Sequence, residues 1–158
     1  MTTAHLIHGF VGAGKTTYAA KLEQDLSAFR FSIDEWMIAL YGQNPPAEKF
    51  EEYHSRTTDL VWNVASRALE LDQPIILDFG FWSRASRDDA RRRIQSLGAK
   101  TILYRVTCAE DTMRSRVLAR TTRSLERALY IDENAIESFR KRFEPLGVDE
   151  PHTLVRTD

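Results

Sequence analysis

The chain has 158 residues, of which 42% are hydrophobic and 28% are charged, and its 22 basic and 23 acidic side chains give a net charge of −1. This length is typical of one domain and this composition of an ordinary globular protein, which excludes disordered, fibrous and membrane-spanning classes. The near-zero net charge argues against a general binder of nucleic acids or membranes.

The charges are distributed unevenly along the chain. Residues 80–130 carry 12 basic and 5 acidic side chains, whereas residues 1–79 carry 6 and 11, and residues 131–158 carry 4 and 7. Seventeen of the 22 basic residues are arginines, whose planar guanidinium groups bind phosphate or carboxylate oxygens in pairs. We therefore expect an anionic group beside residues 80–130.

The single cysteine, Cys108, rules out a disulfide within the chain and favours a reducing compartment. The sequence contains no signal-peptide pattern, and no apolar run approaches the ~20 residues that cross a bilayer. We therefore expect a cytoplasmic protein.

Expected strands and helices alternate along the sequence, and their order sets the fold class. We expect strands at 4–8, 29–33, 74–79, 101–106 and 153–156, and helices at 15–26, 35–41, 47–71, 84–97, 109–119 and 132–142. The long helix follows from apolar residues recurring every three or four positions: Phe50, Tyr53, Leu60, Val61, Val64, Ala68 and Leu71. Such alternation predicts an α/β fold with a parallel sheet and right-handed crossovers, whose ligands bind at the carboxyl ends of the strands.

Residues 9–16 match the G-x-x-x-x-G-K-[ST] pattern of a phosphate-binding loop, between an expected strand and an expected helix. Glycines let backbone N–H groups turn toward a phosphate, and the helix N-terminus adds partial positive charge. Lys15 is expected to reach the β- and γ-phosphates and to act in catalysis, and Thr16 to bind Mg²⁺. The expected cofactors are ATP and Mg²⁺, and the expected nucleotide-binding residues here are Gly9, Gly12, Ala13, Gly14, Lys15, Thr16 and Thr17.

Two acidic residues follow expected strands and therefore belong to the same edge of the sheet as the phosphate loop. Asp78 ends an apolar strand, where it could position Mg²⁺ directly or through water, or could cap the next turn. Asp34 follows the second strand, where it could accept the proton of an acceptor hydroxyl or cap the next helix. Neighbouring Glu35 would point a different way on a helix, so we assign the role of general base to Asp34.

The phosphate loop, residues 31–37 and residues 76–84 together resemble small bacterial P-loop kinases. This is the zeta-toxin-like and chloramphenicol-phosphotransferase-like group, which also includes the kinase domain of polynucleotide kinase. The resemblance spans nearly the whole chain. It implies a three-layer P-loop NTPase fold across residues 1–158, with a five-stranded parallel sheet, flanking helices and a helical lid at about 114–131. The activity that it implies is transfer of the ATP γ-phosphate to a hydroxyl.

The resemblance also assigns roles to arginines in the expected lid. Arg120 and Arg123 match lid arginines that act in catalysis, and Arg120 would also bind the nucleotide. Arg116 lies one helical turn before Arg120 and could join them. Such arginines stabilise the negative charge that spreads over a transferring phosphoryl group.

Six residues are candidates for the acceptor site because they lie near the expected carboxyl edge of the sheet. Trp36 and Met37 follow Asp34 at helical spacing, and Phe81, Trp82 and Arg84 follow the strand that Asp78 ends. Core packing is an equally good explanation for Phe81 and Trp82. The six candidates are Asp34, Trp36, Met37, Phe81, Trp82 and Arg84.

These observations favour an ATP-dependent kinase that phosphorylates a hydroxyl of a small molecule such as a sugar, a nucleotide-sugar or an antibiotic. A polynucleotide 5′-hydroxyl kinase is the first alternative, although polynucleotide kinases usually carry an arginine where this sequence has Met37 or Ile38. The second alternative is a nucleotide-dependent switch without metabolic turnover. No Asn-Lys-x-Asp segment, with which GTPases read guanine, is present.

Overall fold

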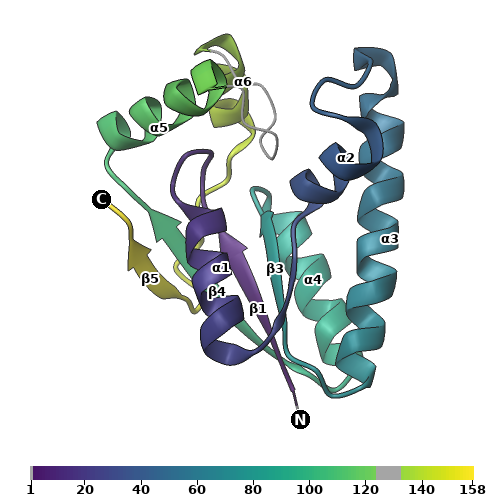
Figure 1. Cartoon of the computed structure of the whole chain (residues 1–158). Coiled ribbons are helices and arrows are strands. Elements are labelled where there is room, and N and C mark those ends of the chain that lie inside the picture. Colours follow the sequence, from purple (N-terminus) through teal and green to yellow (C-terminus); the bar gives the residue numbers. More distant parts are fainter. Residues whose placement is uncertain (1, 124–132) are drawn as a thin grey trace.

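The computed structural model describes residues 2–123 and 133–158, and of these the side chains of all except 120–123. Five parallel strands form one sheet in the order β2-β3-β1-β4-β5 (Figure 1). The strands are β1 (Thr3–His8), β2 (Phe29–Phe31), β3 (Ile75–Gly80), β4 (Lys100–Thr107) and β5 (Thr153–Arg156). The expected α/β fold with a five-stranded parallel sheet is confirmed.

Helices connect successive strands, as parallel pairing requires. They are α1 (Lys15–Leu26), α2 (Ile33–Tyr41), α3 (Phe50–Glu70), α4 (Arg84–Ser96), α5 (Glu110–Arg123) and α6 (Glu133–Arg142), and a 3₁₀ turn, η1 (Ala47–Lys49), precedes α3. Figure 1 shows α3 and α4 on one side of the sheet, and α5 and α6 above its carboxyl edge. The expected helix at 47–71 is therefore split into a 3₁₀ turn and an α-helix, and the strand expected at 29–33 ends two residues earlier.

Side chains that alternate along the central strands pack on opposite faces of the sheet. Leu6 and Leu77 contribute to a core with Val61 and Ala65 of α3 and with Ile94 of α4. Their strand neighbours Ile7 and Ile76 point to the opposite face and contribute to a second core beneath α1. That second core comprises Ile7, Ala13, Ala19, Leu22, Ala28, Ile76, Tyr104 and Val106. Two covered faces make this a three-layer fold.

A third apolar cluster covers the phosphate loop from above. Val11 of the loop packs with Met113 and Val117 of α5 and with Ile136 of α6, and all four side chains are buried. The cluster fixes the positions of α5 and α6 against the loop. In the described part of the chain, no helix combines the length and apolar character needed to cross a membrane.

Candidate nucleotide and acceptor site

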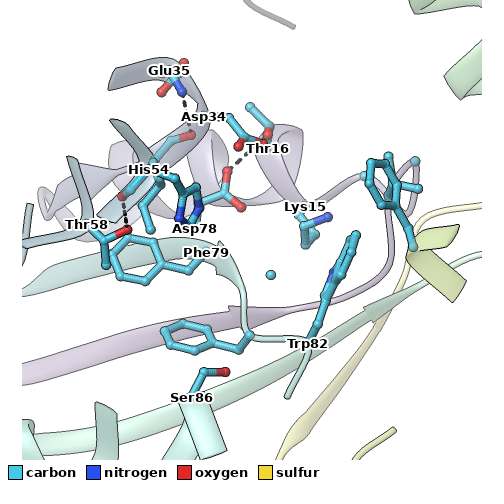
Figure 2. A pocket seen from close by; sticks show the side chains of 18 of the residues that line it. Lys15, Thr16, Asp34, Glu35, His54, Thr58, Asp78, Phe79, Trp82 and Ser86 are labelled. Carbon is cyan, nitrogen blue, oxygen red and sulfur yellow. Dashed lines mark hydrogen bonds between the residues drawn. The ribbon is translucent and has the colours of Figure 1, made fainter. Parts of the chain in front are cut away.

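A cleft of about 1760 Å³ opens at the carboxyl edge of the sheet. The phosphate loop, the start of α2, the end of β3 and parts of α3 and α4 line it, and α5, α6 and β5 complete it. Figure 2 shows Lys15, Asp34, Asp78 and Phe79 gathered around this space. The structure thus brings the two predicted acids and the predicted phosphate-binding lysine into one cleft.

Glycines shape the phosphate loop where no other residue would fit. Gly12 and Gly14 have φ angles of 78° and 94°, in the left-handed region that L side chains rarely adopt. A Cβ on Gly12 would lie 2.8 Å from the carbonyl oxygen of Met113, and one on Gly14 would lie 2.9 Å from the hydroxyl of Thr157. The loop therefore needs glycine at both positions, for its conformation and for the close approach of α5 and the C-terminal segment.

A cation and two oxygen ligands lie side by side where the phosphate loop meets the carboxyl end of β3. The Nζ of Lys15 donates a 3.0 Å hydrogen bond to the carbonyl oxygen of Phe10, within the loop. The hydroxyl of Thr16 donates to Oδ2 of Asp78 over 3.0 Å. Hydroxyl and carboxylate oxygens are the ligand types that Mg²⁺ takes, with water and phosphate completing its octahedron. Thr16 and Asp78 therefore fit a site for Mg²⁺ beside a bound phosphate.

Burial raises the pKa of the Asp78 carboxyl group. Its side chain is 8% exposed, and desolvation raises its pKa above the ordinary aspartate value. The charge of Lys15 and the hydrogen bond from Thr16 act in the opposite direction, and the nearby carboxylate of Asp34 raises the pKa further. A cation bound here would offset the cost of keeping Asp78 ionised.

Asp34 and Glu35 begin α2, but only one of them is available to a ligand. Ser32 caps the helix by accepting a hydrogen bond from the backbone N–H of Glu35. The carboxylate of Glu35 pairs with Arg30 at 2.6 Å. Asp34 is exposed in the cleft, and the described part of the chain offers its carboxylate no hydrogen bond or ion pair. Capping is thus done by Ser32 and not by Asp34.

The predicted acceptor residues after β3 serve the phosphate loop as well as the cleft. Trp82 lines the cleft, donates a 3.0 Å hydrogen bond from Nε1 to the carbonyl of Gly9, and stacks on Phe10 with ring centroids 5.6 Å apart. Phe81 also lines the cleft but is 3% exposed and belongs to the core beneath α3 and α4. Trp82 therefore supports the loop directly.

Three predicted acceptor residues do not line the cleft. Met37 is 1% exposed and accepts a hydrogen bond at its sulfur from Thr57 of α3, so it packs α2 onto α3. Trp36 packs against the core and the ring of Phe31. Arg84 points toward the C-terminal segment, where both of its terminal nitrogens bond Asp149, at 2.8 and 2.7 Å. The expectation that these three face the acceptor is corrected accordingly.

The arginines of α4 are neutralised by the protein itself. Arg87 is fully buried against Glu150, and Arg91 bonds Asp88 and Glu150 at 2.5 and 3.1 Å. Arg93 bonds Asp89 at 2.8 Å. On this helix the expected anion beside the basic segment is therefore a set of carboxylates, and Glu150 from the acidic C-terminal segment is the central one.

Arg116 of α5 contacts both the phosphate loop and the C-terminal segment. It donates to the carbonyl oxygen of Gly12 at 3.4 Å and to Thr157 at 2.8 and 2.6 Å. Thr157 in turn donates to the carbonyl of Ala13 at 2.5 Å. Arg116 and Thr157 line the cleft, as does Thr17. Arg120 and Arg123 end α5, but their side chains and the rest of the expected lid after residue 123 lie outside the described residues.

Several residues that line the cleft belong to no recognisable motif and could not be predicted from the sequence. They come from α3 and α4, far from the phosphate loop in sequence, and the crossovers of the sheet bring them to the same edge. They are His54, Thr58, Asp59, Trp62, Ser86, Asp89 and Arg93. Among the described residues no group of three or more histidine, cysteine, aspartate or glutamate side chains is arranged to hold a metal ion.

A phosphate loop between a central parallel strand and its helix, with an acid at the end of the adjacent strand, defines a P-loop nucleotide-binding protein. The chain belongs to the AAA domain family, whose model matches residues 5–146. A search of curated protein sequences found no match.

Solved structures of kinase-like proteins share the fold. A candidate kinase from Chloroflexus aurantiacus has a TM-score of 0.74 and 21% identity, with 98% of this chain and 87% of that chain covered. Chaetomium thermophilum Kti12 in complex with ADP-AlF3 has a TM-score of 0.76 and 18% identity, with 98% and 89% covered. A chain of the Pnkp1/Rnl/Hen1 RNA repair complex has a TM-score of 0.73 and 17% identity, with 89% and 43% covered. The resemblance to P-loop kinases is confirmed, and these likenesses establish the fold.

Proposed function

We propose that the protein is an ATP-dependent phosphotransferase that moves the γ-phosphoryl group of ATP to a hydroxyl group of a small molecule. The observation that carries the proposal is the exposed carboxylate of Asp34 in the same cleft as Lys15 and the phosphate loop. A phosphate site alone binds a nucleotide, whereas a carboxylate beside it can also activate an acceptor.

The phosphate loop and Lys15 would hold the β- and γ-phosphates, the loop through its backbone N–H groups and Lys15 through its charge. Thr16 and Asp78 would hold Mg²⁺, which neutralises charge on the phosphates when it is bound. The hydroxyl oxygen of Thr16 and the carboxylate oxygen of Asp78 lie 3.0 Å apart, and both are ligand types that Mg²⁺ takes. The ion would also offset the cost of keeping the buried Asp78 carboxyl ionised.

Asp34 would act on the acceptor. Its carboxylate accepts the proton of the acceptor hydroxyl while the hydroxyl oxygen forms a bond to the γ-phosphorus. The bond between the γ-phosphorus and the β,γ-bridging oxygen breaks, and ADP leaves with the electron pair. Glu35 is the weaker candidate because its carboxylate is held by Arg30 at 2.6 Å.

The size of the cleft supports an enzyme with two substrates over a nucleotide-dependent switch. Sites for one drug-sized ligand enclose about 300–1,000 Å³, and this cleft encloses about 1760 Å³. A nucleotide on the phosphate loop would leave room for a second molecule beside Asp34. A switch needs no such space.

The test is Mg²⁺-dependent release of ADP in the presence of a panel of hydroxyl compounds. We expect acceptor-stimulated turnover that Lys15→Ala abolishes. Tight ATP binding without stimulation by any acceptor class would contradict the proposal and favour a switch. The ATP-binding measurement, made on the same samples, shows that the site is intact.

A further inference from the structure

The α3 and α4 side of the cleft differs in chemistry from the side that holds the phosphate loop. We define the acceptor wall as the cleft-lining residues of α3 and α4. In Figure 2, His54 and Thr58 of this wall lie on one side of Asp78, and Lys15 and Trp82 lie on the other. A hydroxyl compound activated by Asp34 would contact this wall.

The cations near the acceptor wall are already neutralised. Arg93, the cleft-lining cation of α3 and α4, bonds Asp89 at 2.8 Å and lies over the ring of Trp62, 5.0 Å from its centroid. Arg30, on neighbouring β2, pairs with Glu35 at 2.6 Å. Among the described residues, the other cleft-lining cations belong to elements around the phosphate loop: Lys15, Lys21, Arg116, Arg142 and Arg156.

Carboxylates remain on the acceptor side after these pairs are counted. Asp34 and Asp59 both line the cleft and are exposed, and no ion pair with either is found in the described part of the chain. Among the residues whose side chains the structure describes, an anionic acceptor would therefore meet two like charges and no unpaired guanidinium on this side. Repulsion of this kind costs about 1–4 kcal/mol for a pair of unit charges at 4 Å in a wet cleft.

The wall also presents hydrogen-bond acceptors. The hydroxyl of Thr58 donates to the carbonyl of His54 at 2.7 Å, and the hydroxyl of Ser86 donates to the carbonyl of Ser83 at 2.7 Å. A hydroxyl has one proton, so the outward lone pairs of both can only accept. Ionised carboxylates also only accept. A ligand that satisfies these oxygens must bring donors, as a hydroxyl or amino group does. The imidazole of His54 on the same wall carries an N–H, which the oxygen of a hydroxyl group can accept.

We infer that the acceptor is a polyhydroxy compound of the sugar or polyol class without an anionic group. Its hydroxyl hydrogens meet the oxygens of the wall, and its apolar face meets the ring of Phe79. This inference rests on the proposed function and narrows its substrate class. It excludes sugar phosphates, sugar acids and polynucleotides as preferred acceptors.

The test compares acceptors that share one sugar scaffold and differ in charge: a neutral hexose, its amino derivative, its sugar acid, its phosphate, and separately a 5′-hydroxyl oligonucleotide. We expect kcat/KM for the neutral and amino forms to exceed that of each anionic form by about tenfold or more. An anionic acceptor that equals or exceeds its neutral counterpart overturns the inference and leaves the proposed kinase activity intact.

Charge reversal on α3 provides a matched pair of variants. Asp59→Lys is expected to raise the ratio of kcat/KM for anionic over neutral acceptors by about tenfold. Glu70→Lys, exposed on the same helix and outside the cleft, is expected to leave the ratio unchanged. Equal ratios in the two variants would overturn the inference. Should no compound turn over, the proposed function fails, and saturation-transfer NMR of the same compounds on ATP-analogue-loaded protein then tests the charge preference alone.

Discussion

The hydroxyl of Thr16 donates a 3.0 Å hydrogen bond to Asp78, across the gap between the start of α1 and the end of β3. The two residues lie 62 positions apart in the sequence, and the parallel pairing of β1 with β3 brings them together. Asp78 is buried, and its pKa is raised mainly by desolvation. A buried carboxylate beside a phosphate loop is costly for folding and suited to binding a cation.

Asp78→Asn is therefore expected to stabilise the metal-free protein and to lower its activity. A carboxyl with a raised folded-state pKa binds its proton more tightly in the folded chain, so its ionisation destabilises the protein as pH rises above the unfolded value of ~3.9. At pH 7 without metal, the variant should have a higher melting temperature. The increase should be about 2–4 °C for each ~1 kcal/mol of ionisation cost that the substitution removes. Its Mg²⁺-dependent turnover should fall.

Thermal melts and a Mg²⁺ titration of ADP release check this prediction. Asp111→Asn, at an exposed site in the first turn of α5, is the control. It should leave the Mg²⁺ titration unchanged and should not raise the melting temperature, because an acid in the first turn stabilises a helix. A lower melting temperature for Asp78→Asn would show that the carboxylate stabilises the apo fold.

Asp34→Asn should lower kcat by about 10²- to 10⁴-fold, the usual contribution of a general base. Nucleotide affinity should stay within about twofold, since Asp34 lies outside the phosphate loop. Glu35→Gln is the matched control one position along the same helix. It weakens the pair with Arg30 and should reduce stability more than turnover. Asp34→Asn with the wild-type kcat would remove Asp34 from the mechanism.

Burial of His8 predicts a loss of stability in mild acid. Desolvation lowers its pKa from 6.5 to about 4, and its Nδ1 donates to the carbonyl of Phe81 at 2.9 Å. The unfolded chain takes up this proton as pH falls through about 6.5, whereas the folded chain resists until about pH 4. Stability is therefore present above pH 6.5 and falls by about 3 kcal/mol across this window, at about 1.4 kcal/mol per pKa unit.

Urea midpoints measured from pH 7 to pH 4.5 test this loss. His8→Asn keeps a side-chain N–H for the carbonyl of Phe81 and should flatten the profile, although His5, whose pKa burial also lowers, leaves a residual slope. Carboxyls with depressed pKa values, such as Glu150 at about 2, titrate below this window. An unchanged slope in His8→Asn would assign the acid sensitivity elsewhere.

Local sequence signals were sufficient to predict the strands and the phosphate loop. Steric demands on Gly12 and Gly14 are local, and the alternation of strands and helices determined the parallel sheet. The periodicity of α3 predicted a helix but did not tell which of its apolar residues are buried. Leu60 and Val64 are 44% and 40% exposed, whereas Val61 and Ala65 are fully buried. Both faces of this helix carry apolar residues, so the pattern alone could not orient it.

The sequence predicted the parts of the candidate site that a local motif or the end of a strand marks. It could not predict contacts between side chains that are far apart in the sequence. Asp34 lies in the first turn of α2, just after β2, and Asp78 lies near the carboxyl end of β3. Their meeting at one edge of the sheet therefore followed from topology. Arg84 resembled a substrate-binding arginine in sequence, but its partner is Asp149, 65 residues away. Nothing local to α4 indicates that the C-terminal segment returns to neutralise it.

The buried pair between Arg87 and Glu150 supplies a final prediction, on stability. Arg87 donates to both carboxylate oxygens of Glu150, at 2.8 and 3.0 Å, and to the carbonyls of Phe81 and Glu144 at 2.8 and 3.1 Å. The side chains are 0% and 1% exposed. Arg87→Met would leave a buried carboxylate with its main partner removed, which typically costs about 3–5 kcal/mol.

Arg92→Met on the same helix is the control for this prediction. Arg92 is 72% exposed and pairs with Asp89 only at 3.8 Å, so its loss should change stability by less than about 0.5 kcal/mol. Urea unfolding at pH 7 measures both variants. Should Arg87→Met not fold, Glu150→Gln keeps the shape of the site and should still lose more stability than Arg92→Met. Equal stability of Glu150→Gln and Arg92→Met would mean that the C-terminal segment is held to α4 by apolar packing instead of this pair.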